Sequence, residues 1–389
     1  MLELAVLFAL LPVAAAAGWL AAQRKDHRRR ERGSPALSGR YFRGLNYLLN
    51  EESDKAVEVF LSLAEVNQDT VETHMALGSL FRRRGEMDKA IRFHKHIMTQ
   101  PDLNEEQRAQ ALLELGEDYM RAGLLDRAER LFSELLSFDP RSGRAARRLL
   151  DIYQQEKDWD KAIEQARNLQ RLEGENSNPL IAHFHCELAI EALGRGAIDD
   201  ARRALRQARR CDPRHPRPRL IEADLAAREE HWGEAASRYR EACELDPDAL
   251  VGVVDPLIEA HRRAGQADQL VEWLAALGSD CDMTTPTVAL ARLQAESDPQ
   301  LAVRTLLDHL SRRPTVRGVE FLMDLLDRQG ASLDDVGPDL IRTLMQRLLD
   351  GQPRFRCRHC GFSGNAYHWL CPSCRRWNTT RAIEGVLGE

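Results

Sequence analysis

Gly123-Leu-Leu-Asp126-Arg-Ala128 is the clearest copy of a pattern that runs through most of this 389-residue chain. The same glycine, acidic residue and alanine recur as Gly85-Glu-Met-Asp88-Lys-Ala90 and as Gly196-Ala-Ile-Asp199-Asp-Ala201, and two looser copies keep the alanine without the glycine. From one alanine to the next the steps are 34, 38, 34, 39 and 34 residues, along the series Ala56, Ala90, Ala128, Ala162, Ala201 and Ala235.

A period of thirty-four residues indicates the tetratricopeptide repeat, in which each unit is a pair of antiparallel helices. A glycine twelve residues before the alanine is expected to let the two helices pack closely, and a proline twelve residues after it is expected to end a helix. Aromatic residues recur three positions after that glycine and four after the alanine. These positions are held by Gly44, Gly78 and Gly116; Tyr47, Phe81, Tyr119 and Tyr153; Phe60, Phe132 and Tyr239; and Pro140, Pro213 and Pro247.

The two longer steps predict inserted loops near Asn104 and Gly174, because a solenoid tolerates insertions between its repeats. Beyond Ala235 the pattern weakens into degenerate repeats, and residues 315–328 and 338–349 predict one more helical pair. The expected fold is therefore all-α, a tetratricopeptide-repeat superhelical solenoid over residues 36–350. Such a solenoid presents a long concave surface that binds other proteins.

The first twenty-two residues predict a membrane anchor. Residues 2–22 are apolar except for Glu3, one proline and one glycine, and a helix of that length crosses a hydrocarbon layer of ~30 Å at ~1.5 Å per residue. Six basic and two acidic side chains follow in residues 23–32, whereas a cleaved signal peptide carries its charge before the apolar run. The positive-inside rule then predicts a transmembrane anchor over 1–22, a basic juxtamembrane linker over 23–35, and a cytosolic body.

Near the other end, Cys357-Arg-His-Cys360-Gly is separated by ten residues from Cys371-Pro-Ser-Cys374. Two such Cys-x-x-Cys pairs can offer four thiolates to one tetrahedral metal ion, and the spacing does not separate zinc from a single iron. Disulfides are disfavoured because the predicted location is the reducing cytosol. We therefore predict one metal ion, iron or zinc, bound by Cys357, Cys360, Cys371 and Cys374.

The segment 353–389 is too short to bury a useful apolar core, so the metal is expected to contribute much of its folding free energy. His359 and His368 could replace a sulfur ligand, although four sulfurs already complete a tetrahedral shell. We expect residues 338–349 to form the surface on which this module docks. The small core of the module is predicted to consist of Phe355, Phe362, Tyr367, Trp369 and Trp377.

The chain carries a net charge of −6. Because the basic linker alone contributes about +4, the rest of the chain carries about −10 and is a poor general binder of nucleic acid. A local basic run allows two interpretations. It could bind an acidic partner or a phosphate-bearing lipid, or it could be a solvated helix face, which charge runs usually are. The run consists of Arg202, Arg203, Arg206, Arg209, Arg210, Arg214, Arg217 and Arg219. Four isolated cysteines are expected to be buried as small apolar residues: Cys186, Cys211, Cys243 and Cys281.

No catalytic constellation is visible in the sequence. The chain has no Gly-rich phosphate loop, no Gly-x-Ser-x-Gly turn and no His-Glu-x-x-His helix. A closed shell of four cysteines leaves no coordination position for a substrate or an activated water. We therefore predict a protein that is not an enzyme, with no catalytic residues.

The order of these parts resembles the lipopolysaccharide assembly protein B family over the whole chain. The resemblance implies a small C-terminal rubredoxin-like or zinc-ribbon metal module whose ligands are Cys357, Cys360, Cys371 and Cys374. Gly361 follows the first pair as in a rubredoxin knuckle, but Arg375 follows the second, which leaves the N–H···S geometry there open. The interval between the pairs is also far shorter than in free rubredoxins.

The resemblance also implies a function. Members of this family lie in the bacterial inner membrane and act as adaptors for an FtsH-type membrane AAA protease. They promote turnover of the lipid A-committing deacetylase and are linked to the lipopolysaccharide assembly and export proteins. Two alternatives stay open: a redox protein that relays electrons through the terminal metal, and a zinc ribbon that binds nucleic acid through Arg354, Arg356, Arg358, Arg375 and Arg376.

Overall fold

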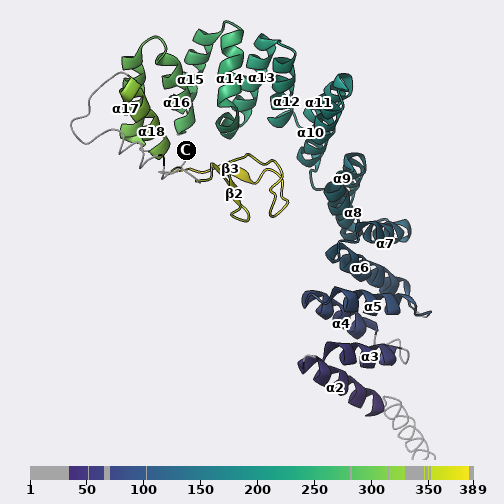
Figure 1. Cartoon of the computed structure of the whole chain (residues 1–389). Helices are drawn as coiled ribbons and strands as arrows, with labels where there is room; N and C mark the ends of the chain where they lie inside the picture. Colours follow the sequence, from purple (N-terminus) through teal and green to yellow (C-terminus); the bar gives the residue numbers. More distant parts are fainter. Residues whose placement is uncertain are drawn as a thin grey trace, which may run out of the picture. The chain divides into compact units, whose positions relative to one another are not determined.

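The computed structural model describes residues 35–50, 52–64, 71–101, 103–280, 283–313, 315–328 and 352–384, together with residues 346 and 349. The chain is divided into two compact units, the first ending at Gly174 and the second beginning at Glu175 (Figure 1). The predicted repeat solenoid is confirmed, because the described residues from Pro35 to Arg328 form successive antiparallel helix pairs.

Within its described residues the first unit consists of helix pairs in chain order. They are α2 (Pro35–Leu49) with α3 (Ser53–Ala64), α4 (Val71–Arg83) with α5 (Met87–Met98), α6 (Glu105–Arg121) with α7 (Leu125–Phe138), and α8 (Gly143–Glu156) with α9 (Trp159–Glu173). The second unit continues with α10 (Asn178–Gly194), α11 (Ile198–Cys211), α12 (Arg217–Arg228), α13 (Trp232–Leu245), the short η2 (Pro247–Ala249), α14 (Leu250–Arg263), α15 (Ala267–Asp280), α16 (Thr284–Gln294), α17 (Pro299–Arg312) and α18 (Val316–Arg328).

The sequence pattern follows from how each pair packs. All six alanines of the repeat are fully buried. A Cβ atom added to Gly44 would lie 2.6 Å from the ring of Phe60, and one added to Gly116 would lie 2.5 Å from the ring of Phe132. The first helix of each of these pairs therefore meets the aromatic side chain of the second at a position where a larger residue does not fit.

The glycine of the repeated pattern has a different role. Gly85, Gly123 and Gly196 lie five residues before the buried alanine and have φ values of 82°, 74° and 74°. This left-handed conformation suits glycine because other residues pay about 1–2 kcal/mol for it. In the two looser copies Lys157 and Glu230 occupy the same position with φ of 61° each, so the turn keeps its shape without glycine.

The second repeat departs from the pattern. His94 stands where its neighbours have Phe60 and Phe132, and it is completely buried. Its Nδ1 lies 2.5 Å from Asp118 Oδ2 and its Nε2 lies 3.1 Å from the carbonyl oxygen of Met75. Arg82 completes the cluster, 2.8 Å from Asp118. An apolar contact between helices is thus replaced by a buried network of hydrogen-bonded polar side chains.

The predicted breaks between helices are confirmed. Helices α7, α11 and α13 each end two residues before Pro140, Pro213 and Pro247. The predicted insertions form the loops before α6 and α10, and Asn104 caps α6 through its side chain, which accepts a hydrogen bond from the Gln107 backbone N–H. The degenerate repeats form α14 to α17, and α18 matches the predicted helix at 315–328.

Several expectations fall outside the described residues. These are the anchor over 1–22, almost all of the linker over 23–35 and, apart from residues 346 and 349, the helix at 338–349. No described helix is long and apolar enough to cross a membrane. The division into segments 1–22, 23–35, 36–350 and 353–389 stays a prediction.

Replacing Gly116 by alanine tests the close helix contact. The new methyl group would overlap the Phe132 ring, so we expect the local stability of α6 and α7 to fall by about 1–3 kcal/mol. Gly39→Ala is the matched control, because nothing lies within 4 Å of its added Cβ atom, and alanine raises helix propensity by up to about 1 kcal/mol. Hydrogen exchange measures the effect of Gly116→Ala on α6 and α7 and that of Gly39→Ala on α2. Equal stability changes in the two variants would contradict the packing argument.

Candidate metal centre

The C-terminal module is built on three short antiparallel strands. They are β1 (Phe355–Cys357), β2 (Ser363–Gly364) and β3 (Thr380–Ala382), arranged in the order β2-β1-β3. Cys357 closes β1, and Cys360 lies in the turn between β1 and β2. The second cysteine pair lies in the long connection between β2 and β3.

The fold brings the four predicted ligands together. The sulfur atoms of Cys357, Cys360, Cys371 and Cys374 all lie within 4.8 Å of one another. Cys357 Sγ is 3.7 Å from Cys374 Sγ, and Cys360 Sγ is 3.6 Å from Cys371 Sγ. A tetrahedron of sulfurs at a Zn–S distance of about 2.3 Å has edges of about 3.8 Å, whereas a disulfide needs about 2.05 Å. The donor set therefore fits one tetrahedral ion.

The two histidines near the cysteines are placed differently. His359 Nδ1 lies 3.3 Å from an Arg376 nitrogen, and the ring of His368 packs edge-on against Phe362. Neither belongs to the group of converging ligand atoms in the described residues. The arrangement favours four sulfur ligands over a mixed set.

Both cysteine turns have the same backbone shape. The N–H of Gly361 donates to the carbonyl of Cys357 at 2.9 Å, and the N–H of Arg375 donates to the carbonyl of Cys371 at the same distance. Gly361 has φ of 78° and Arg375 has φ of 53°, so the arginine adopts the left-handed conformation that glycine takes in the first turn. Backbone N–H groups of Phe362 and Arg376 also hydrogen-bond to Cys360 and Cys374. The second knuckle thus forms although it lacks the glycine.

Hydrogen bonds prepare Cys357 to act as a thiolate. Burial alone would raise its pKa, but the Thr379 hydroxyl and the backbone N–H groups of Cys360 and His359 outweigh burial and lower the pKa of the Cys357 thiol to about 6. Cys357 Sγ lies 3.2 Å from Thr379 Oγ1. A lowered thiol pKa favours metal ligation, since the thiolate is the ligand.

The second cysteine pair sits at the tip of a hairpin whose base carries two tryptophans. Leu370 and Trp377 form an antiparallel bridge, and the N–H of Asn378 donates to the carbonyl of Trp369 at 2.9 Å. The N–H of Cys371 donates to the carbonyl of Arg376 at 3.0 Å. We call residues 369–377 the tryptophan hairpin. Its geometry links the spacing of the two indoles to the turn that holds Cys371 and Cys374.

The tryptophan hairpin packs on two buried histidines of the second unit. Trp377 stacks on His183 of α10, with ring centroids 4.3 Å apart and planes 28° from parallel. Trp369 lies 5.6 Å from the ring of His215, just before α12. His183 Nε2 and His215 Nε2 are 3.1 Å apart, and the two residues expose 0% and 2% of their surface. The two nitrogens are at hydrogen-bond distance, so one ring donates its N–H and the other accepts it.

Arg217 lies beside both indoles. Its guanidinium is 5.8 Å from the ring centroid of Trp369 and of Trp377, and one of its nitrogens lies 2.7 Å from a carboxylate oxygen of Glu187. Such cation–π contacts gain strength when the arginine is desolvated, and Arg217 is buried. The ion pair with Glu187 compensates the charge that burial would otherwise leave isolated.

A second patch of contacts lies further along the same surface. Phe355 and Ala382 pack against Val251 at the start of α14. Arg354 donates to the carbonyl oxygen of Val251 at 2.8 Å, and a nitrogen of Arg381 lies 2.8 Å from a carboxylate oxygen of Asp246. Figure 1 shows the strands on the inner side of the arc formed by α10 to α18.

One sequence expectation about the module needs correction. Trp369 and Trp377 were expected only in its own small core, and Trp369 does pack on Tyr367 with ring centroids 4.8 Å apart, but both indoles also contact the solenoid. Phe355 and Tyr367 pack against each other as expected. The expected docking surface at 338–349 lies largely outside the described residues, so that expectation stays a prediction. The contacts described for the module fall on α10, α12, α14 and the turns before α12 and α14.

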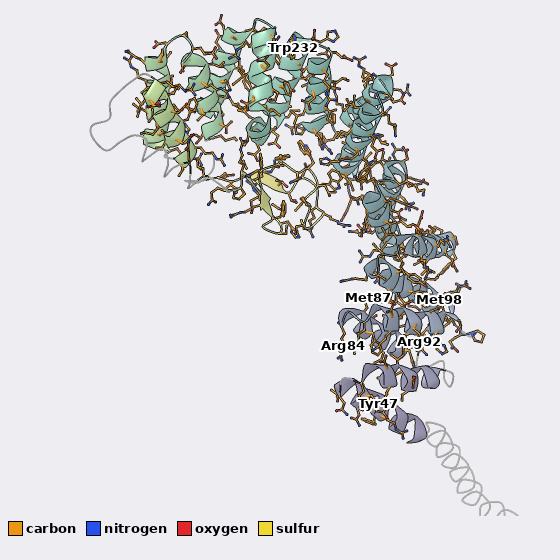
Figure 2. All side chains as sticks on the ribbon, viewed as in Figure 1. Tyr47, Arg84, Met87, Arg92, Met98 and Trp232 are labelled. Carbon is orange, nitrogen blue, oxygen red and sulfur yellow. The ribbon has the colours of Figure 1, made fainter. Side chains whose placement is uncertain are left out.

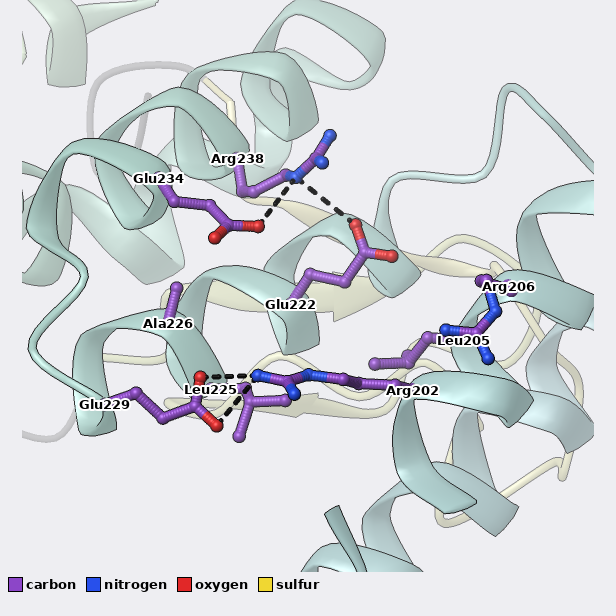
Figure 3. A pocket seen from close by; sticks show the side chains of 9 residues that line it. All are labelled: Arg202, Leu205, Arg206, Glu222, Leu225, Ala226, Glu229, Glu234 and Arg238. Atoms are coloured by element: carbon purple, nitrogen blue, oxygen red, sulfur yellow. Dashed lines mark hydrogen bonds and ion pairs between the residues drawn. The ribbon is translucent and has the colours of Figure 1, made fainter. Parts of the chain in front are cut away.

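The arginine run on α11 and α12 is largely compensated by carboxylates. Arg202 pairs with Glu229, Arg209 with Glu222 and Arg217 with Glu187. These helices and α13 line a small pocket, where Arg238 approaches both Glu222 and Glu234 (Figure 3). Because most charges at this surface already have partners, the structure favours a solvated helix face for the run, except at Arg217, which is buried beside the module.

The isolated cysteines follow expectation where they are described. Cys186 and Cys243 are fully buried, and burial raises the pKa of each thiol to about 12. Cys211 is half-buried and packs against the core of α10 and α11. Cys281 lies outside the described residues.

Comparison with known proteins agrees with this architecture. A family model described as a rubredoxin metal binding domain matches residues 355–381, and tetratricopeptide repeat models match 73–109, 113–174 and 186–249. Lipopolysaccharide assembly protein B of Escherichia coli (strain K12) is 34% identical over 395 residues, which cover all of both chains. The chain belongs to the lipopolysaccharide assembly protein B family. The Haemophilus influenzae member is 30% identical over 393 residues and 98% of each chain.

Solved structures give a weaker likeness. The crystal structure of MamA protein is 21% identical and covers 47% of this chain and 94% of that one, with a TM-score of 0.33. A tetratricopeptide repeat protein from Parabacteroides merdae is 14% identical and covers 66% of this chain and 98% of that one, also with a TM-score of 0.33.

Arg375→Gly tests the shape of the second cysteine turn. Glycine removes the cost of the left-handed conformation, about 1–2 kcal/mol, so the variant should hold its metal against a chelator at least as well as the wild type. Arg375→Val is the matched comparison, since a β-branched residue fits this conformation poorly. As the chelator concentration rises, the glycine variant should retain the most metal and the valine variant the least. The reverse ranking would show that the turn is not as described.

Acidification should weaken the docking of the module. Burial, together with the charge of Arg217, lowers the pKa of His215 to about 4, and burial also holds the pKa of His183 well below its ordinary value. In the unfolded chain the pKa of this histidine is about 6.5. The stabilisation that comes from keeping His215 neutral is therefore fully present above pH 6.5 and is lost as the pH falls toward 4.

Between pH 7.5 and 5.5 we expect the second unit to lose about 1.4 kcal/mol through this residue, measured by urea denaturation. His215→Gln, which cannot take up the proton, should show a smaller loss, and metal content measured in the same samples separates this effect from acid release of the ion. An identical pH dependence in both proteins would refute the assignment.

Proposed function

We propose that this protein is a non-enzymatic scaffold, anchored in the inner membrane, that regulates lipopolysaccharide biosynthesis and assembly. The observation that carries the proposal is its kinship with lipopolysaccharide assembly protein B over the full length of both chains. The tetratricopeptide architecture supports the same function, because such solenoids bind other proteins along an extended surface.

In this proposal the scaffold acts by holding a client protein close to a membrane protease. The segment 1–22 fixes the chain in the membrane beside an FtsH-type protease, with its body on the cytoplasmic side, and the solenoid holds the lipid A-committing deacetylase close to that protease. Raising the local concentration of a client can increase its turnover by orders of magnitude without a chemical step performed by the scaffold. The same scaffold would contact lipopolysaccharide assembly and export proteins.

The metal centre has a structural role in this proposal. Cys357, Cys360, Cys371 and Cys374 would hold one zinc or iron ion in a closed tetrahedral shell, which offers no open position for a substrate. The ion supplies folding free energy to a module with only three short strands. An electron relay is the second candidate function, favoured by the match to a rubredoxin metal binding domain, and reversible cycling of bound iron in the purified protein would support it.

The contacts of the basic residues argue against a nucleic-acid-binding zinc ribbon. Arg354 donates to Val251, and Arg358 pairs with Glu384 at 3.1 Å. Arg376 lies beside His359. The Arg358 charge is compensated by a carboxylate and the Arg354 side chain is turned onto the solenoid, which reduces the number of arginines available for the phosphate contacts that dominate nucleic-acid affinity.

Deleting residues 1–22 tests the placement mechanism. We expect the truncated protein to fold, since each repeat packs only on its neighbours, and to fail in cells that lack the native protein. Replacing the segment by an unrelated transmembrane helix of the same orientation should restore function if placement is what the anchor provides. Survival and deacetylase level report the outcome. Full complementation by the truncated form would contradict the proposal, and crosslinked pull-down from membranes would identify the partners.

A further inference from the structure

The inner surface of the second unit is covered by the chain itself. The described contacts of the module with helices fall on α10, α12 and α14, which are the first helices of their pairs, and on the turns that precede α12 and α14. In tetratricopeptide solenoids the concave surface is the one that binds partners. The module therefore occupies the place of a bound ligand.

The surface under the tryptophan hairpin is suited to flat aromatic groups. His183 presents its ring face to Trp377, and Phe184 meets the same indole edge-on at 5.9 Å. Arg217 supplies a guanidinium beside both indoles, with its charge balanced by Glu187. Aromatic rings and a desolvated arginine are the groups that stabilise a buried indole most effectively.

The hairpin geometry couples this contact to the metal. Trp369 and Trp377 lie at the two ends of a segment that holds Cys371 and Cys374 at its tip. Without an ion, four neighbouring thiols no longer tie the two turns together, and a module of this size has too small a core to keep its shape. Loss of the ion should then remove the fixed spacing of the two indoles.

We propose that the inner surface of α10 and α12 is an indole-binding surface, that the metal module is its resident ligand, and that metal release uncovers it for a protein segment presenting tryptophan side chains. The proposal goes beyond the scaffold function and does not depend on which client the scaffold holds. It concerns only His183, Phe184, His215 and Arg217 on one side and the tryptophan hairpin on the other.

Chemical labelling of histidines tests whether the metal controls access. The full-length protein in detergent is treated with diethyl pyrocarbonate, and modification of each histidine is followed by mass spectrometry. In the metal-loaded protein His183 and His215 should react slowly, because they are almost completely buried. After chelation, and in the Cys371→Ser/Cys374→Ser variant, both should react at least tenfold faster.

Two internal references make the result interpretable. His231, whose side chain is 65% exposed, should react quickly in every sample. His94, which is fully buried in the first unit, and His261, which is buried in α14 of the second unit, should stay protected throughout. If either becomes reactive together with His183, metal loss unfolds the solenoid and the proposal fails. It also fails if His183 and His215 stay protected after the metal has gone.

A tryptophan variant separates the indole contact from the metal. Trp377→Ala should expose His183 while the bound metal is retained, and millimolar N-acetyltryptophanamide should slow its labelling again by filling the vacated site. Trp232→Ala is the matched control, because Trp232 lies at the start of α13 on the side away from the module (Figure 2). Unchanged protection of His183 in Trp377→Ala, or no rescue by the indole compound, would overturn the indole-binding surface.

Discussion

Convergence of four sulfur atoms is the constraint on which the inner surface of the second unit depends. The cysteine sulfurs lie within 4.8 Å of one another, and the turn that carries two of them also spaces Trp369 and Trp377. Those indoles pack on a buried histidine pair and on a buried arginine of the solenoid. In our proposal, the coordination geometry at the cysteines therefore controls whether this long-range contact forms.

The solenoid and the metal module are stabilised in different ways. In the solenoid each helix packs on its neighbours in sequence, through fully buried alanines and glycines that admit close approach, so stability accumulates repeat by repeat. The module has almost no core of its own. It gains contacts that bridge large separations along the chain, such as Arg354 with Val251 and Arg381 with Asp246. We therefore expect its fold to depend on the ion and on the solenoid together.

Sequence reasoning found the features that local patterns encode and missed those that join distant parts of the chain. The alanine series, the close-packed glycines, the prolines and the cysteine spacing predicted the helix pairs and the ligand group, because periodicity and short motifs are local. The left-handed turns at Lys157 and Glu230 could not be predicted from the sequence, because neither residue is a glycine. The docking surface was missed because His183 and His215 come from different repeats. One signal was available: two tryptophans flank the second cysteine pair in a module too small to bury both.

X-ray absorption at the edge of the bound metal in the purified full-length protein tests the central claim most directly. The geometry described here predicts one ion per chain with four sulfur neighbours and, for zinc, metal–sulfur distances of about 2.3 Å. Nitrogen or oxygen in place of any sulfur, or fewer than four sulfurs around the ion, would contradict the closed cysteine site. The coupling between that site and the tryptophan hairpin would then have no basis.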